Sequence, residues 1–277
     1  MYFNHYERKE LALDDIRARA PSAFAVEPHS SRSERYAYVS TAEVLQSLYK
    51  EGFRAFQASQ AVTRTEDKRN FTKHLIRLRH PNMHAINGVF PEIALLNSHD
   101  GTSAYKLKLG LFRLVCLNGC VTGQDFAGVS VYHKGDITGE VIEGAYSIVE
   151  QTPLLTDRVE ELHSVSLTDR EAEILAGQAL TYHYGEAPPV EPWGVIQPRR
   201  EADRAVSLWH RYQVIQENML KGGIPYRNNA SGRRNTTRPV RVIDGDLKLN
   251  KALWDLTSQM LALKNGSFDE AGSDWLN

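Results

Sequence analysis

The sequence predicts an α+β fold, in which helices pack on a small antiparallel sheet and a mainly helical C-terminal half follows. Two observations lead to this prediction. Apolar and polar residues alternate in short segments between residues 53 and 135, which is typical of strands that have one covered face. Between residues 139 and 263, apolar residues recur at helical spacing behind N-capping residues.

The N-terminal part of the chain is expected to supply two helices. Residues 1–39 are mostly polar, with one helix predicted over 8–19. A stronger signal covers residues 40–52, where Ser40 and Glu43 have the spacing of a capping box. A glycine at position 52 predicts the end of that helix.

Strands are predicted over residues 53–62, 71–80, 89–99 and 126–135. In the second segment, Leu75 shares a face with Lys73, Arg77 and Arg79, while His74, Ile76, Leu78 and His80 take the other face. Pro91 predicts an edge strand or a bulge for the third segment. Residues 103–119 are expected to form a further strand, or a strand that passes into a helix.

The C-terminal half is expected to be helical over residues 139–152, 167–185, 200–223 and 245–263. Thr168 and Glu171 predict a second capping box, and Gly222-Gly223 predict a helix end. An extended connector is expected over 185–198, which contains Pro188, Pro189, Pro192 and Pro198. The predicted division is therefore a polar segment 1–39, a core 40–184, the connector 185–198, a helical region 199–265 and an acidic tail 266–277.

The bulk composition is that of an ordinary globular protein. Of 277 residues, 42% are hydrophobic and 24% are charged, and the formal net charge is −1. A charge so close to zero gives no global attraction to nucleic acid or membranes, so any basic site must be local. With two cysteines, no apolar signal segment and no apolar run long enough for a membrane span, we expect a cytoplasmic protein with reduced thiols.

Positive charge gathers in three clusters. The densest lies at residues 227–241, with five arginines and no acid; the others are residues 64–79 and the group Lys106, Lys108 and Arg113. Arginine binds phosphate in a bidentate manner and stacks on bases, so these clusters suit a phosphate backbone. The alternative is that they are ordinary solvated loops, or that the arginines pair with the acidic helices at 140–173.

Three chemical interpretations of the segment around residue 100 are weaker. Ser98, His99 and Asp100 are adjacent, whereas the members of a catalytic triad come from separate chain positions. A zinc site built on Cys116 and Cys120 lacks a second cysteine pair, so we expect these thiols to be structural. A metal nuclease would need Glu92, Asp100, Lys106 and Lys108 to converge. Asp100-Gly101 and Asn118-Gly119 are better explained as tight turns.

Four sequence blocks resemble the phage/plasmid-like proteins of domain-of-unknown-function family 932. They are "NSHDGTSAYKL" with "RLVCLNG", then "IQENMLKGG", "RRNTTRPVR" and "LNKALWDLT". The resemblance implies a mobile-element setting and no assigned activity. A more distant organisational likeness is to single-strand-annealing proteins of phages and of the eukaryotic Rad-fifty-two group, which implies a basic groove and ring assembly.

We therefore expect a protein of mobile-element DNA metabolism that binds single-stranded DNA, as a homo-oligomer, and that acts in recombination by strand annealing. No catalytic residue, metal or cofactor is expected. The expected DNA-binding residues are Arg227, Arg233, Arg234, Arg238, Arg241, Tyr226, Arg77, Arg79, Lys106, Lys108 and Arg113. The alternatives are a host-defence-countering or regulatory protein that binds another protein, and a metal-dependent nuclease. The acidic tail, which ends in Trp275-Leu276-Asn277, is a candidate for protein recruitment.

Overall fold

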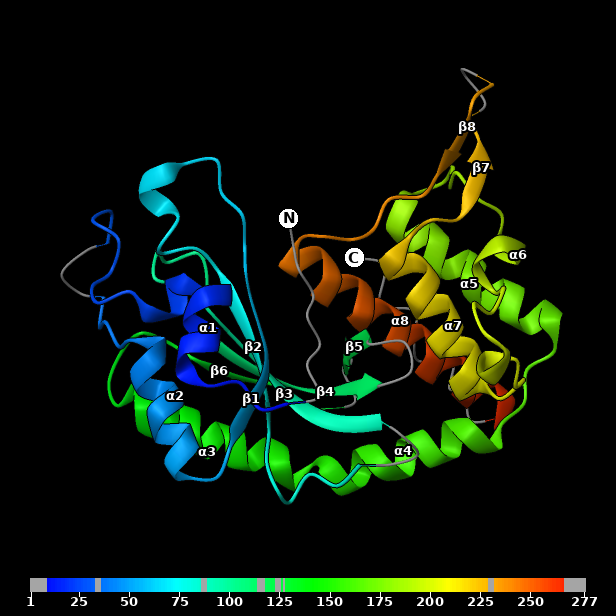
Figure 1. Cartoon of the computed structure of the whole chain (residues 1–277). Helices are drawn as coiled ribbons and strands as arrows, with labels where there is room; N and C mark the ends of the chain where they lie inside the picture. The colour runs from blue at the N-terminus through cyan, green and yellow to red at the C-terminus, as the bar shows by residue number, and fades with distance from the viewer. Residues whose placement is uncertain are drawn as a thin grey trace. The chain divides into compact units, whose positions relative to one another are not determined.

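A computed structural model of the chain describes residues 9–32, 36–85, 89–113, 118–122, 126, 128–228 and 232–266 (Figure 1). The chain forms two compact units: unit 1 is Met1–Leu154 with Arg241–Leu247, and unit 2 is Leu155–Val240 with Lys248–Asn277. The sequence placed a boundary at residue 184, whereas the units divide within helix α4 (Thr152–Ser164). The segment before residue 40 is part of unit 1, because Leu11, Ile16 and Ala23 are buried there.

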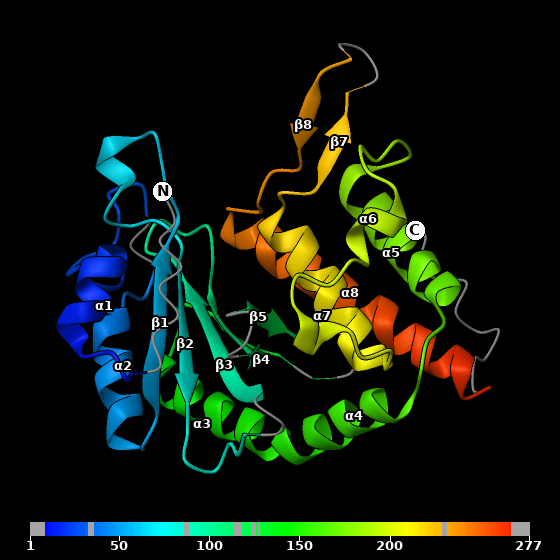
Figure 2. The same ribbon diagram turned by 45° about the vertical axis from the view of Figure 1, so that its right-hand side comes forward.

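Unit 1 is built on an antiparallel meander, which Figure 2 shows from a second side. Its strands lie in chain order: β1 (Arg54–Gln60), β2 (His74–Arg79), β3 (Val89–Asn97), β4 (Tyr105–Arg113) and β5 (Asn118–Val121). A short strand, β6 (Val129–Val131), pairs with Tyr105–Leu107 of β4, which β5 leaves unpaired. The antiparallel sheet and the helical C-terminal half confirm the predicted α+β class.

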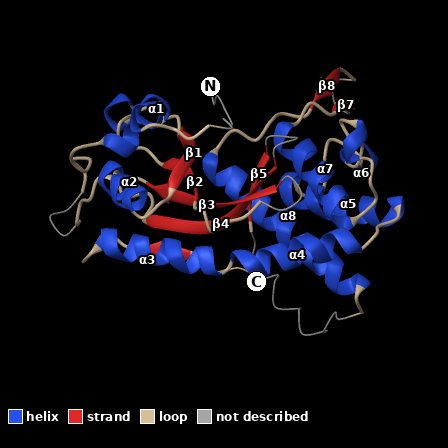
Figure 3. Ribbon diagram, turned by 60° about the horizontal axis from the view of Figure 1, so that its bottom comes forward, coloured by secondary structure: helices blue, strands red, loops and turns tan. Residues whose placement is uncertain are grey.

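Helices cover one face of this sheet (Figure 3). They are α1 (Leu13–Arg19), the 3-10 turn η1 (Pro21–Phe24), α2 (Thr41–Lys50) and α3 (Ile137–Glu150). Beneath them the alternation predicted for residues 71–80 is confirmed, since Ile76 and Leu78 are buried on the same face as Ile93 and Leu95 of β3. We call this the helical face of the sheet.

The opposite face carries a smaller apolar cluster and several charges. Leu75, Ala94 and Leu96 pack against Ile243 at the start of α8 (Ile243–Lys264). Lys73 forms an ion pair with Asp244 there, at 2.6 Å. A further short turn, η2 (Glu66–Lys68), lies in the long connection between β1 and β2.

Three local predictions for unit 1 were wrong. Pro91 lies in β3, an interior strand; it is tolerated because the ladder with β2 ends at Ile93, so no β2 carbonyl needs its missing N–H. Asn118-Gly119 is not a tight turn but the start of β5, paired with Arg113 and Phe112. Ser40 precedes α2 without making a capping hydrogen bond.

Unit 2 is mainly helical, as predicted. Its elements are α5 (Asp169–Tyr184), α6 (Pro192–Val195), η3 (Glu201–Asp203), α7 (Leu208–Lys221), the hairpin β7 (Pro225–Arg227) and β8 (Arg234–Thr236), and most of α8. The capping box of Thr168 and Glu171 is confirmed, with both reciprocal hydrogen bonds present. Helix α4 was missed, and α6 interrupts the expected connector.

No helix among the described residues is both long enough and apolar enough to span a membrane. The predictions for Cys116 and for the acidic tail beyond residue 266 lie outside the described residues. Cys120 lies in β5, whose side chains are not described.

Candidate functional site

A two-stranded hairpin holds most of the arginine cluster predicted at residues 227–241. Strands β7 and β8 pair antiparallel, and no strand of the larger sheet joins them (Figure 1). All five arginines of the cluster are exposed: Arg227, Arg233, Arg234, Arg238 and Arg241. We call Pro225–Thr236 the basic hairpin; Arg238 and Arg241 follow it in the chain.

The base of the basic hairpin is tied firmly to the end of α7. Gly222 ends that helix with a φ of +61°, and a Cβ atom there would lie 2.6 Å from the carbonyl oxygen of Thr237. Thr237 also bonds the two residues that follow Gly222. Its carbonyl accepts from Gly223 N–H, and its hydroxyl accepts from Ile224 N–H. A non-glycine residue at 222 would therefore disturb the hairpin's anchor.

Positive charges face each other across the basic hairpin. Arg227 and Arg234 are directly opposite partners in the ladder. Like charges directly opposite each other destabilise a strand pair, so an anion bound between the two arginines would stabilise the hairpin by reducing their repulsion. Within the described part of the chain, none of the five arginines forms an ion pair with a carboxylate, so the predicted alternative of pairing with the acidic helices at 140–173 is not seen inside this chain.

Aromatic side chains accompany these arginines in unit 2. Tyr226 is half-buried in β7, opposite Asn235. Burial, and to a smaller extent the charge of Tyr226, raise the pKa of Tyr184 at the end of α5. The large ring of Trp193 in α6 is also exposed.

The sheet arginines do not point outward as predicted. Arg77 and Arg79 both meet Glu92, which is only 2% exposed: Arg79 donates to Glu92 Oε1 at 2.7 and 2.9 Å, and an Arg77 nitrogen lies 3.5 Å from Oε2. The guanidinium of Arg79 also lies 4.2–5.2 Å from the ring centroids of Phe56, Phe90 and Phe112. These two arginines therefore pair with Glu92 within the sheet and are not the outward phosphate contacts that the sequence predicted.

Arg113 belongs to a different face. The register of β3 with β4 pairs Val89 with Arg113, whereas Glu92 pairs with Gly110, so Arg113 lies on the face opposite to that of Glu92. It is also buried. Of the sheet residues predicted to contact DNA, Lys106 is exposed and Lys108 half-buried, and both lie on the face of Glu92.

The spacing of two carboxylates does not support the metal-nuclease arrangement. Glu92 lies in the buried arginine cluster, five residues of strand β3 before Asn97, a separation of about 17 Å in an extended chain. Asp100 lies beyond that, in the turn after β3, where its carboxylate accepts hydrogen bonds from the backbone and hydroxyl of Thr102. The predicted turn at Asp100-Gly101 is confirmed, with a φ of +78° at the glycine.

A buried polar network under α2 was not predicted. Its centre is the hydroxyl of Thr41, which lies 2.9 Å from His74 Nε2, 3.2 Å from His99 Nε2 and 3.0 Å from the Asn97 amide nitrogen. His74, His99 and Asn97 come from β2 and from the end of β3, and all three are fully buried. No metal-binding group of three His, Cys, Asp or Glu side chains is found among the described residues.

The hydrogen-bond partners favour one arrangement of the protons in this network. His74 Nδ1 lies 3.3 Å from the Thr72 carbonyl, which can only accept, and 3.0 Å from the Ser22 hydroxyl, which can accept or donate. With the proton on Nδ1, Nε2 accepts from the Thr41 hydroxyl. The Thr41 oxygen then accepts from His99 Nε2 and the Asn97 amide, because the Tyr105 hydroxyl, also 3.2 Å away, donates to the carbonyl of Val39. Both imidazoles are neutral in this arrangement. Burial lowers the pKa of His74 to about 4 and that of His99 to about 3.

We expect the protein to lose stability in acid because of these two histidines. Their pKa values are lowered in the folded state, so the unfolded chain binds more protons below pH 6.5. Above that pH each histidine makes its full contribution to the free energy of unfolding. The contribution is lost as the pH falls toward 4 for His74 and toward 3 for His99. Each histidine contributes a slope of up to about 1.4 kcal/mol per pH unit, measurable by urea unfolding between about pH 7.5 and 5.

His84→Gln serves as the control for this titration, because His84 is exposed and outside the network. It should leave the slope unchanged. A free energy of unfolding that stays constant from pH 6.5 to 5 would show that the buried network does not exclude protons.

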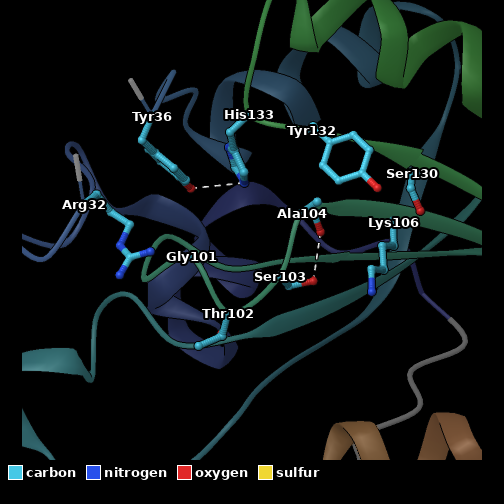
Figure 4. Close-up of a pocket in the computed structure, with 10 residues that line it drawn as sticks. All are labelled: Arg32, Tyr36, Gly101, Thr102, Ser103, Ala104, Lys106, Ser130, Tyr132 and His133. Carbon is cyan, nitrogen blue, oxygen red and sulfur yellow. Dashed lines mark hydrogen bonds between the residues drawn. The ribbon is translucent and has the colours of Figure 1, made fainter. Parts of the chain in front are cut away.

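An open pocket of about 500 Å³ adjoins this network in unit 1 (Figure 4). Its walls come from four segments: Arg32 and Tyr36 before α2, the turn Gly101–Ala104, Lys106 in β4, and Ser130 with Tyr132 and His133 at β6. Tyr36 and His133 join the pocket to the buried network, because His133 Nε2 lies 3.1 Å from the Tyr36 hydroxyl and 3.2 Å from the side-chain oxygen of Asn97. The Tyr36 hydroxyl donates to the carbonyl of Ser98.

The sequence pointed to two of the four segments that line this pocket. The turn at residue 100 and Lys106 were predicted as features, whereas Arg32, Tyr36 and Tyr132 were not. The signal for the missed Arg32 is Gly101 itself, since a glycine in a turn after a strand permits both a positive φ and the close approach of another segment.

The chain belongs to the family described as "Domain of unknown function (DUF932)", whose model matches residues 28–254. Two curated relatives come from Escherichia coli (strain K12). UPF0380 protein YafZ is 46% identical over 258 residues, 91% of this chain and 92% of that protein, and UPF0380 protein YfjQ is 44% identical over 254 residues, with the same coverage of 91% and 92%. No solved structure matches the chain. Neither relative's name states an activity.

Proposed function

We propose that this protein binds single-stranded DNA through the basic hairpin and the arginines that follow it. The observation that carries the proposal is the set of five exposed arginines without a carboxylate partner in the described part of the chain, two of them directly opposite each other. Bidentate guanidinium groups suit phosphate oxygens, and a chain of phosphates would neutralise the charge that the hairpin concentrates.

A single strand is favoured over a duplex for two reasons. Tyr226 and the exposed Trp193 offer aromatic faces, on which unstacked bases can lie. No described helix presents the basic cluster, and the hairpin is only three residues long on each strand, so base reading in a major groove has little support here. Sequence preference should be weak, since phosphate contacts carry no sequence information.

The wider setting is also part of the proposal. We infer a cytoplasmic, homo-oligomeric protein encoded on mobile elements, which pairs complementary strands during recombination. The support is the family resemblance and the basic cluster, and the annealing step itself rests on analogy with other single-strand-annealing proteins.

A binding titration tests the proposal directly. Fluorescent single-stranded and double-stranded oligonucleotides are titrated with the full chain at about 50 and 200 mM salt, with and without Mg²⁺. We expect preference for the single strand, an affinity that falls steeply with salt, and no cleavage. Failure to bind at low salt would contradict the proposal and favour a protein-binding role in conflict with a host. Cleavage that requires Mg²⁺ would instead favour a nuclease.

A further inference from the structure

The pocket at the β3–β4 turn has the features of a binding site that is separate from the basic hairpin. It lies in unit 1, and it combines two cationic side chains, several hydroxyl groups and an exposed ring. No carboxylate is among the described residues that line it. We infer that this pocket binds a nucleoside 5′-monophosphate group, with the phosphate held by Arg32 and Lys106.

Arg32 is positioned for such a role by its immediate neighbours. Its Nε and Nη2 atoms donate to the hydroxyl of Ser31, which in turn bonds His29 at 2.8 Å. The guanidinium packs directly over Gly101, where an added Cβ atom would lie 2.1 Å from Nη1. Glycine at 101 therefore does two things: it allows the φ of +78°, and it leaves room for the arginine.

Lys106 approaches the pocket from the sheet. Figure 4 draws it and Arg32 on opposite sides of the Gly101–Ser103 turn. It is exposed, and its neighbours across the ladder are Leu96 in β3 and Ser130 in β6. No ion pair of Lys106 or Arg32 with a carboxylate is seen in the described part of the chain. The cationic side chains thus leave positive charge for a bound anion.

The size and the aromatic wall of the pocket favour a nucleotide over a bare phosphate. A volume of about 500 Å³ is within the range of small-molecule sites and far exceeds one phosphate group. Tyr132 is 73% exposed, so its ring offers a face on which a base can stack. Tyr36 stacks on His133 with ring centroids 4.3 Å apart, and their hydrogen bonds to the buried network make that wall rigid.

Calorimetric titration of the full chain with thymidine 5′-monophosphate, thymidine and inorganic phosphate tests the inference. We expect the monophosphate to bind, inorganic phosphate to bind more weakly, and thymidine not to bind. Arg32→Gln and Lys106→Gln should each weaken binding by about 10- to 100-fold, the worth of a charge-assisted hydrogen bond. Gly101→Ala should weaken it as well, because the new Cβ displaces the Arg32 guanidinium.

Lys50→Gln is the matched control, since Lys50 is an exposed lysine of α2 outside the pocket, and it should leave binding unchanged. Absence of monophosphate binding would overturn the inference, and so would binding that Arg32→Gln and Lys106→Gln both leave intact. The monophosphate group could belong to a free nucleotide or to the 5′ end of a DNA strand. Single strands with a 5′-phosphate are therefore compared with strands that have a 5′-hydroxyl, and tighter binding of the phosphorylated strands would assign the pocket to strand ends. These strands are tested on a variant that lacks the arginines of residues 233–241, so that failure of the hairpin proposal and failure of the pocket are seen separately.

Discussion

Replacement of Arg233, Arg234, Arg238 and Arg241 by glutamine should flatten the salt dependence of single-strand binding. Each phosphate of a single strand that the protein no longer neutralises lowers the slope of log affinity against log salt by about 0.7, so four such phosphates lower it by about 3. These side chains are exposed and have no carboxylate partner in the described structure, so the fold should survive the change. Anisotropy titrations at four or more salt concentrations measure the slope.

A control variant with the same change in charge separates local contacts from the global field. Arg17, Arg170, Arg204 and Lys50 are exposed and lie outside the basic hairpin, and their replacement by glutamine should change the slope little. If the hairpin variant instead loses its assembly state while the intact protein shows no salt-dependent binding, the arginines serve contacts between subunits, and the DNA-binding proposal fails.

Local signals in the sequence predicted much of the secondary structure. The alternation around Leu75 correctly assigned the two faces of β2, and Thr168 with Glu171 marked the start of α5. Gly222 marked the end of α7. Each of these signals involves residues within a few positions of one another. Helix α4 was missed although Pro153 lies near its first turn, a position where proline is favourable.

The sites that depend on strand pairing could not be predicted. His74 meets Asn97 across the ladder and His99 through Thr41, and these residues are 23 to 58 positions apart in sequence. The arginines of β2 were predicted to be surface charges. Their partner Glu92 lies on the next strand, and the sequence alone does not show how the two strands are aligned. A cluster of charges in the sequence stays exposed only where the neighbouring strand carries no opposite charge. The arginines of the basic hairpin are such a case, whereas those of β2 meet Glu92 on the next strand.

Glu92→Gln should destabilise the protein by about 3–5 kcal/mol, because it removes a buried carboxylate that pairs with the buried Arg77 and the partly buried Arg79. Arg77 is 1% exposed, so its guanidinium has no access to water that would compensate. The three phenylalanine rings around Arg79 offset part of the cost, since a cation over an aromatic face is stabilised by about 0.5–2 kcal/mol. Urea unfolding at neutral pH measures the change.

Glu143→Gln provides the comparison, because Glu143 is exposed on α3 and its replacement should alter stability by no more than about 0.5 kcal/mol. Folded Glu92→Gln protein should still bind single-stranded DNA with an unchanged salt slope, since the basic hairpin belongs to the other unit. A stability loss below about 1 kcal/mol, accompanied by tighter DNA binding, would mean that Arg77 and Arg79 reach solvent once the carboxylate is gone. The sheet would then be a second phosphate-binding surface, and the assignment of these arginines to a purely structural cluster would be wrong.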